Sequence, residues 1–241
     1  MAPSGLVVEI GAGTGELTAA LLDRGNEVVA VEVEDRLVTH LQERFASRPG
    51  LRIIQADART MSLAELLPPN RPFTVAGNLP YFAASPIIRH VLEGSPRPSE
   101  LVVMVQREVA HRIAAKPGKL SILGLAVQVY AEPTLLFDVP PIAFDPPPAV
   151  YSTVIRLVLR QAPLVPAWRI AAFFELVTRT FKNPRKHLHN ALRAGIALPP
   201  GGAAEALEAA GIDPMRRPET LTIAEWLALL DATEARRAHA S

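Results

Sequence analysis

Short apolar runs recur along the chain up to Gln161 and predict the strands of one sheet. Each run is four to seven residues long, too short for a buried helix, and helical segments lie between most of the first five. The predicted strands are Leu6–Ile10, Glu27–Val33, Leu51–Ala56, Phe73–Ala76, Leu101–Val105, Leu135–Val139 and Thr153–Leu159. Strands that alternate with helices form parallel sheets, so we expect a seven-stranded, mostly parallel, Rossmann-like α/β fold. The last two strands should close it as an antiparallel hairpin.

After Gln161 the pattern becomes wholly helical. The clearest apolar stripe, at the spacing i, i+3, i+4 and i+7, consists of Ile170, Phe173, Phe174, Val177 and Phe181. The change predicts a boundary between an α/β domain over residues 1–161 and a small all-α domain over residues 162–241.

Three helix starts are predicted from capping residues. Ser85 precedes Pro86 and Asn183 precedes Pro184, an order typical of an N-cap followed by the first helical position. The third start is a capping box, formed by Thr222 and the glutamate three residues later.

Three glycines, Gly11, Gly13 and Gly15, separate the first predicted strand from the helix that follows it. Glycines let the backbone approach a ligand closely, and a helix start adds oriented N–H groups. Glu32 lies 21 residues after Gly11, the spacing at which a βαβ nucleotide fold binds ribose hydroxyls. The glycine pattern is not that of a dinucleotide site, and no lysine follows it, so a nucleoside cofactor without a pyrophosphate is favoured. S-adenosylmethionine is the common cofactor of this kind.

Asp57 follows the third predicted strand. A carboxylate at this place either caps a helix or accepts a hydrogen bond from the adenine amine of a cofactor. We favour the second interpretation, because ligands of open α/β sheets bind at the carboxyl ends of the strands.

The fourth strand runs into Asn78-Leu79-Pro80-Tyr81. Gly77 should let the backbone turn away, and Pro80 keeps Leu79 out of the helical region, so we expect the Leu79 carbonyl to point aside. The Asn78 amide, this carbonyl and the Tyr81 ring would suit a flat heterocycle with an amino group, such as adenine. An ordinary strand-ending turn is the alternative, since asparagine and proline both favour turns.

Charge is unevenly distributed, although the formal net charge of the 241 residues is only +1. Residues 1–65 contain ten acidic and six basic residues, whereas residues 151–200 contain eight basic residues and one acidic residue. The first part agrees in sign with a cationic sulfonium cofactor, and the second with a polyanion.

Part of the basic region would form one stripe on a helix that starts at Pro184. The stripe consists of Arg185, His189 and Arg193, with Lys186 beside it. It is either a solvated face or an RNA contact, and the sequence favours neither.

The chain has no cysteine, which excludes disulfides and thiolate metal sites, and we predict no metal site. No apolar run reaches the roughly 18 residues that span a membrane, and residues 1–5 are too short for a signal peptide. We therefore expect a cytoplasmic protein that binds no membrane.

Together these features resemble the ribosomal RNA adenine N6,N6-dimethyltransferase family (KsgA type), whose members modify small-subunit (16S) ribosomal RNA. The resemblance covers nearly the whole chain. It rests on the glycine turn, the Asn78 tetrapeptide, the proline-rich stretch from Val139 to Ser152, the segment from Phe181 to Lys186 and the ending from Asp213 to Leu221.

The resemblance implies a methyltransferase that dimethylates adenine amines in the ribosomal RNA of immature small ribosomal subunits, as a monomer. It implies that S-adenosylmethionine is bound by Glu9, Gly11, Gly13, Glu32, Asp57 and Asn78. The target adenine would be held by Asn78, Leu79, Pro80, Tyr81 and Phe144. The RNA would be bound by Arg185, Lys186, His189 and Arg193.

Two other functions stay open: an enzyme acting on large-subunit ribosomal RNA, and a ribosome-assembly factor that binds RNA without efficient catalysis. Family members usually carry a segment before the first strand that closes over the cofactor, whereas five residues precede Leu6 here. We therefore expect this chain alone to bind the cofactor weakly and turn over slowly.

Overall fold

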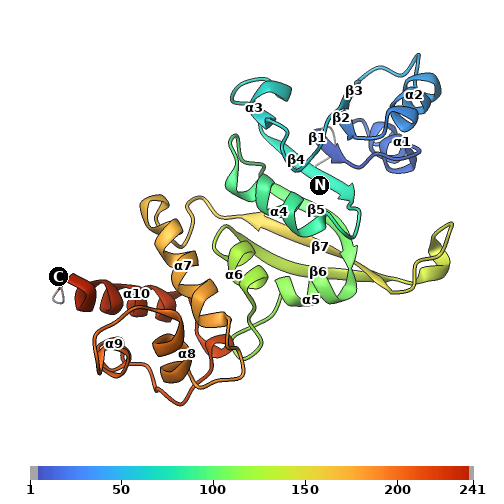
Figure 1. Cartoon of the computed structure of the whole chain (residues 1–241). Helices are drawn as coiled ribbons and strands as arrows, with labels where there is room; N and C mark the ends of the chain where they lie inside the picture. Colours follow the sequence, from blue (N-terminus) through green and yellow to red (C-terminus); the bar gives the residue numbers. More distant parts are fainter. Residues whose placement is uncertain (1–4, 239–241) are drawn as a thin grey trace. The chain divides into compact units, whose positions relative to one another are not determined.

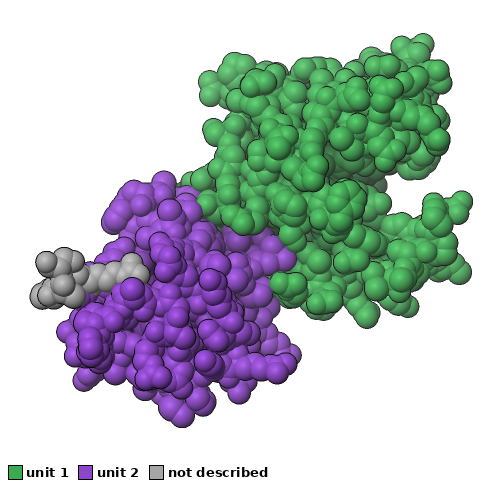
Figure 2. Space-filling view, in the orientation of Figure 1, with its two compact units in different colours: residues 1–114, 130–161 green, residues 115–129, 162–241 purple. Residues whose placement is uncertain are grey.

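The computed structural model describes residues 5–238. Residues 1–4, on which most of the signal-peptide prediction rests, and residues 239–241 lie outside the described part. The chain forms two compact units, coloured separately in Figure 2. One comprises residues 1–114 and 130–161, here called the sheet unit, and the other comprises residues 115–129 and 162–241, here called the helical unit.

The sheet unit is built on seven strands in the order β3-β2-β1-β4-β5-β7-β6 (Figure 1). The strands are β1 (Leu6–Ile10), β2 (Glu27–Glu32), β3 (Leu51–Gln55), β4 (Phe73–Asn78), β5 (Glu100–Gln106), β6 (Ala131–Val139) and β7 (Ser152–Leu159). Strands β1 to β5 pair in parallel, and β7 pairs antiparallel with both β5 and β6. The predicted Rossmann-like sheet and its closing hairpin are confirmed.

The helices of the sheet unit are α1 (Glu16–Asp23), α2 (Asp35–Arg44), α3 (Leu63–Leu66), α4 (Ala84–Glu93) and α5 (Arg107–Ile113), with a 3-10 turn at Pro141–Ala143. Helix α4 starts at Ala84, and Ala83 occupies the cap without a side-chain hydrogen bond, so the prediction of Ser85 as the N-cap is wrong. Pro86 still falls in the first turn, where its missing N–H has no intrahelical partner to lose.

The strand order reverses at β1, because β2 and β3 lie on one side of it and β4 and β5 on the other. A crevice opens at such a reversal, outside the carboxyl ends of the strands. Gly77 shows how closely β1 and β4 approach here, since a Cβ atom on Gly77 would lie 2.3 Å from the Ile10 carbonyl oxygen. The prediction that Gly77 ends the strand is wrong, because β4 continues to Asn78. The glycine is needed for close packing of the two strands.

The helical unit contains α6 (Ile122–Gln128), α7 (Ile170–Phe181), α8 (Leu188–Gly195), α9 (Gly202–Ala209) and α10 (Ile223–Ala238), with 3-10 turns at Ala167–Arg169 and Pro218–Thr220. The predicted stripe of α7 faces inward, and Phe173 and Val177 are fully buried. The second segment of this unit begins after Gln161, and its first segment is residues 115–129, which the sequence analysis assigned to the first domain. They belong to the helical unit, where the Gly118 and Leu120 N–H groups donate to the Glu219 carbonyl at 2.9 and 3.1 Å.

Helix α8 starts at Leu188, with His187 at its cap, so the prediction of a helix start at Asn183 and Pro184 is wrong. These two residues lie in the turn after α7, where the Asn183 carbonyl accepts the Lys186 N–H at 3.0 Å. A turn satisfies the same Asn-Pro signal as a cap.

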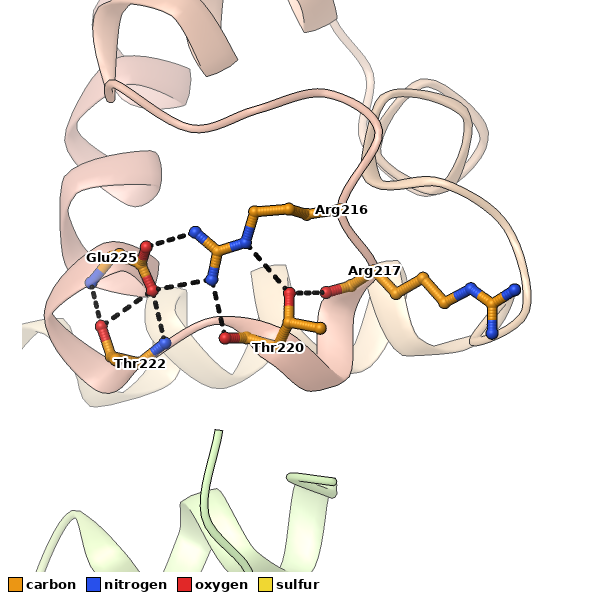
Figure 3. Close-up of polar contacts among 5 residues, drawn as sticks. All are labelled: Arg216, Arg217, Thr220, Thr222 and Glu225. Atoms are coloured by element: carbon orange, nitrogen blue, oxygen red, sulfur yellow. Dashed lines mark hydrogen bonds and ion pairs between the residues drawn. The ribbon is translucent and has the colours of Figure 1, made fainter. Parts of the chain in front are cut away.

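A polar network holds the start of α10 (Figure 3). The predicted capping box is confirmed: the Thr222 N–H donates to Glu225 at 2.7 Å, and the Glu225 N–H donates to the Thr222 hydroxyl at 3.1 Å. The Arg216 guanidinium donates to both Glu225 carboxylate oxygens and to the Thr220 carbonyl. Hydrogen bonds from Arg216 lower the pKa of Glu225 to about 2. The Arg217 side chain points away from the network.

None of the helices between residues 5 and 238 is long and apolar enough to cross a membrane.

Candidate active site

A cavity of about 480 Å³ opens at the carboxyl ends of β1 to β4, within the sheet unit. Its walls include Gly11, Glu32, Asp57 and Asn78, each of which lies at or just after the end of a different strand. The structure therefore brings together the residues that the sequence analysis singled out on four separate strands.

Glu32, at the end of β2, is nearly buried, and backbone N–H groups hold its carboxylate. Gly13 donates to one oxygen at 2.9 Å, and Val33 and Glu34 donate to the other at 2.7 and 3.1 Å. Gly13 can fold back in this way because it adopts a φ of 57°, which disfavours side chains. A carboxylate has about four acceptor positions, so Glu32 keeps capacity for a hydroxyl donor in the cavity.

Glu9 does not line the cavity. It is buried in β1, where its carboxylate accepts a hydrogen bond of 2.6 Å from the Thr18 hydroxyl on α1. Burial, opposed by hydrogen bonds from Thr18 and aided by the charge of Glu32, raises the pKa of Glu9 to about 7. Its position does not support the predicted direct contact with a cofactor and instead ties α1 to the sheet beneath the glycine turn.

Asp57, after β3, lines the cavity together with Arg59, a residue that the sequence analysis did not single out. The Arg59 backbone N–H and Nε each donate to Oδ1, at 2.8 and 3.0 Å, and Nη2 donates to Oδ2 at 2.6 Å. These hydrogen bonds lower the pKa of Asp57 to about 2, so the carboxylate stays ionised and can act only as an acceptor near neutral pH. An arginine two residues after the aspartate was the signal available in the sequence.

The Asn78 tetrapeptide forms the turn at the end of β4. The Leu79 N–H donates to the Met104 carbonyl at 3.1 Å, and the Pro80 carbonyl accepts the Ala83 N–H at 2.9 Å. Within residues 5–238, no hydrogen bond to the Leu79 carbonyl continues the ladder. The Leu79 side chain is buried whereas Asn78 is exposed, so the turn presents polar groups to the cavity and anchors itself through leucine.

The wall beside this turn is aromatic. The Tyr81 hydroxyl lies 2.8 Å from the Ser152 hydroxyl, which is fully buried at the start of β7. Phe144 and two prolines, Pro146 and Pro148, reach the same cavity from the loop between β6 and β7. The late proline-rich stretch and the Asn78 turn therefore form one site, although more than 60 residues separate them in the sequence.

The predicted RNA-binding residues all lie in the helical unit but do not share a helical stripe. Arg185 and Lys186 are exposed in the turn before α8, and Arg193 is exposed on α8. His189 is half-buried, and its backbone N–H donates to the Pro214 carbonyl at 3.2 Å.

The sheet order, the cavity at its reversal and the similarity to solved methyltransferase structures define the class: a Rossmann-like methyltransferase with a helical C-terminal region. The family model described as ribosomal RNA adenine dimethylase matches residues 1–234. The chain belongs to this family.

Curated relatives support the assignment. The ribosomal RNA small subunit methyltransferase A of Dehalococcoides mccartyi is 41% identical over 224 residues, which span 93% of this chain and 77% of the relative. The protein of the same name from Desulfitobacterium hafniense is 42% identical over 230 residues, which span 94% of this chain and 81% of the relative.

Two solved structures resemble the whole chain. The 23S rRNA methyltransferase ErmE has a TM-score of 0.73 and 26% identity, with 97% of this chain and 93% of ErmE covered. A dimethyladenosine transferase from Plasmodium falciparum has a TM-score of 0.80 at 23% identity, with 98% and 92% covered, and supports the fold alone.

Proposed function

We propose that this protein uses S-adenosylmethionine to dimethylate the exocyclic N6 amine of adenines in small-subunit ribosomal RNA. The observation that carries the proposal is the shared cavity. The Asn78 turn, the carboxylates of Glu32 and Asp57, and Phe144 all line it, and the chain belongs to the ribosomal RNA adenine dimethylase family.

The residues present fit the cofactor. Glu32 has acceptor capacity for a ribose hydroxyl, and Asp57 is an ionised acceptor for an adenine amine. Gly11 and Gly13 line the cavity without side chains, which leaves room for the methionine end. When bound, S-adenosylmethionine supplies the methyl group on its cationic sulfonium.

The Asn78 amide oxygen and the Leu79 carbonyl are proposed to accept the hydrogens of the target amine, two before the first methylation and one before the second; each transfer would release one proton to water. Held in this way, the amine's lone pair is drawn out of conjugation with the ring and aimed into the cavity. Tyr81 and Phe144 would clamp the base, which must leave its helix to reach such a site. No nucleophilic side chain is required, because orientation alone can supply roughly 7–11 kcal/mol.

The RNA partner is proposed to be the immature small subunit, bound by a monomer in the cytoplasm. Arg185, Lys186 and Arg193 are exposed and suited to phosphate contacts, whereas the half-buried His189 has less freedom to reach RNA. These contacts do not read sequence, so they would position the RNA.

Large-subunit ribosomal RNA is the rival substrate, because the ErmE structure resembles this chain over 97% of its length. The helical unit therefore does not discriminate between the two substrates. Sequence identity favours the small subunit: the small-subunit relatives are 41% and 42% identical to this chain, against 26% for ErmE.

The test is a methylation assay with labelled S-adenosylmethionine on immature small subunits and, in parallel, on protein-free large-subunit RNA. We expect label in the small-subunit RNA, with mass mapping showing two methyl groups on one adenine base. Label confined to the large-subunit RNA would reverse the substrate assignment. RNA binding without label in either substrate would favour an assembly factor.

A further inference from the structure

Phe82 is an aromatic side chain that lines the cavity and yet is 85% exposed. Single exposed apolar residues are ordinary on protein surfaces, so exposure alone assigns nothing. Its setting is unusual, however. Phe82 directly follows Tyr81 of the Asn78 turn, and its other neighbour, Ala83, is buried.

The backbone on both sides of Phe82 is fixed. The Tyr81 hydroxyl is bonded to the buried Ser152, and the Ala83 N–H donates to the Pro80 carbonyl at 2.9 Å. These contacts anchor the turn from which the Phe82 ring projects, and the ring lies at the rim as an exposed apolar surface.

The other wall carries a similar feature. Ile142 is 89% exposed and lies two residues before Phe144, which lines the cavity. Each of the two segments that supply an aromatic residue to the cavity therefore also presents a large apolar side chain to solvent. Glu32, Glu34 and Asp57 line the cavity together with Arg59, which is paired to Asp57, so the acidic lining residues outnumber the basic one and disfavour phosphates but not the neutral face of a base.

We infer that Phe82 is a stacking platform for the unpaired base next to the target adenine. The inference rests on the proposed function and adds a substrate requirement, namely a single-stranded segment of at least two bases. Removing one adenine from its stack leaves its neighbour without a partner, and an aromatic ring can replace that partner. A purine neighbour offers the larger overlap and should be preferred.

The test compares Phe82→Ala with Phe82→Trp, which keeps an aromatic face, and with Phe137→Ala. Phe137 is a matched control, because it is also aromatic and 60% exposed, on β6, but does not line the cavity. Base stacking on an aromatic side chain is worth enough that Phe82→Ala should raise the KM for immature small subunits about tenfold to a hundredfold. Phe82→Trp and Phe137→Ala should stay near the wild-type KM, and all variants should bind S-adenosylmethionine as the wild type does.

A binding readout separates this inference from the proposed function. Short single-stranded RNAs carry 2-aminopurine beside one adenine, and stacking on Phe82 should quench its fluorescence in the wild type but not in Phe82→Ala. If the wild type methylates no RNA, the proposed function fails while this experiment still decides the role of Phe82. An unchanged KM together with equal quenching in Phe82→Ala would overturn the inference. So would a loss of cofactor affinity as large as the loss of RNA affinity, because Phe82 would then cover the cofactor.

Discussion

The sheet unit and the helical unit each contain a carboxylate whose pKa an arginine lowers to about 2, Asp57 with Arg59 and Glu225 with Arg216. Both carboxylates are about one-third exposed. Asp57 is bonded within one loop, by a residue two positions away, and faces a cavity. Glu225 joins the segment before α10 to the first turn of that helix. The contacts of the first pair lie within one loop, whereas those of the second link two segments of the fold.

An arginine that lowers the pKa of a carboxylate therefore does not by itself indicate the role of that carboxylate. The surroundings of the pair indicate it better. A carboxylate bonded inside its own loop and open to a cavity is available for a ligand. A carboxylate that connects two segments and does not line the candidate site maintains the fold. The comparison predicts that changes at the strand ends reduce activity but not stability, and that changes in the α10 network do the reverse.

The largest effect is expected for Asn78→Ala. Removing one preorganised polar group from a site of this kind reduces transition-state stabilisation by roughly 2–4 kcal/mol. Single-turnover methylation should slow accordingly, while calorimetry shows a much smaller loss of S-adenosylmethionine affinity and the melting temperature stays the same. Wild-type turnover in this variant would remove Asn78 from the mechanism.

Glu32→Ala should mainly weaken cofactor binding. Loss of a charged acceptor for ribose hydroxyls is worth about 1.5–3 kcal/mol, or roughly tenfold to a hundredfold in the dissociation constant. In the variant, water in the cavity can accept the hydrogen bonds of the three N–H groups that donate to Glu32 in the wild type, so circular dichroism should report a folded protein. Equal cofactor affinity in the two proteins would show that the ribose assignment is wrong.

Glu9 is the exception within the sheet unit, because it is a strand carboxylate that does not line the candidate-site cavity. Its pKa is raised from 4.5 to about 7, so the folded state binds a proton more tightly than the unfolded state. Stability from this group is complete below about pH 4.5 and falls as the pH rises through about 7. At pH 8, Glu9→Gln should therefore be more stable than the wild type by roughly 2 kcal/mol.

The measurement is urea unfolding of both proteins at pH 5 and pH 8. Glutamine can still accept a hydrogen bond from the Thr18 hydroxyl, so the contact between β1 and α1 is kept and cofactor affinity should not change. A stability difference that is the same at both pH values would contradict a raised pKa for Glu9.

Glu225→Gln tests the structural role of the carboxylate in the helical unit. The pKa of Glu225 is lowered, so its contribution is present above about pH 4.5 and is lost as the pH falls towards 2. Partial exposure screens the pair, so we expect a loss of about 1 kcal/mol at pH 7 and convergence with the wild type at low pH. Thermal unfolding of both proteins at pH 7 and at low pH measures this difference in stability. A change in cofactor affinity would contradict a purely structural role.

Much of the fold could be predicted from the sequence because each strand is a local apolar run. Predicted and observed strand ends agree within one or two residues for β1 to β5 and β7, whereas β6 starts four residues before the predicted Leu135. Helix starts were harder to predict. Proline fits either a first turn or a loop, so Pro86 and Pro184 carried the same signal and turned out to lie in different structures.

The candidate site could be predicted only in part. Strand-end ligands follow from local order, and the structure places Glu32, Asp57 and Asn78 around one cavity. The Arg59 contact depends on the path of a loop, and Glu9 points away from the cavity, neither of which spacing alone determines. Hydrogen bonds between distant segments, such as those that Gly118 and Leu120 donate to the Glu219 carbonyl, cannot be predicted from local sequence patterns.

The discontinuity of the helical unit has a consequence for gene organisation. The unit needs the insertion over residues 115–129 as well as the extension after Gln161, so no single fusion point in the gene could add or remove it. A stop codon after Gln161 would leave α6 and its neighbour Val129 without the partners that bury them. An exchange of the helical unit between related proteins would therefore have to transfer both segments together.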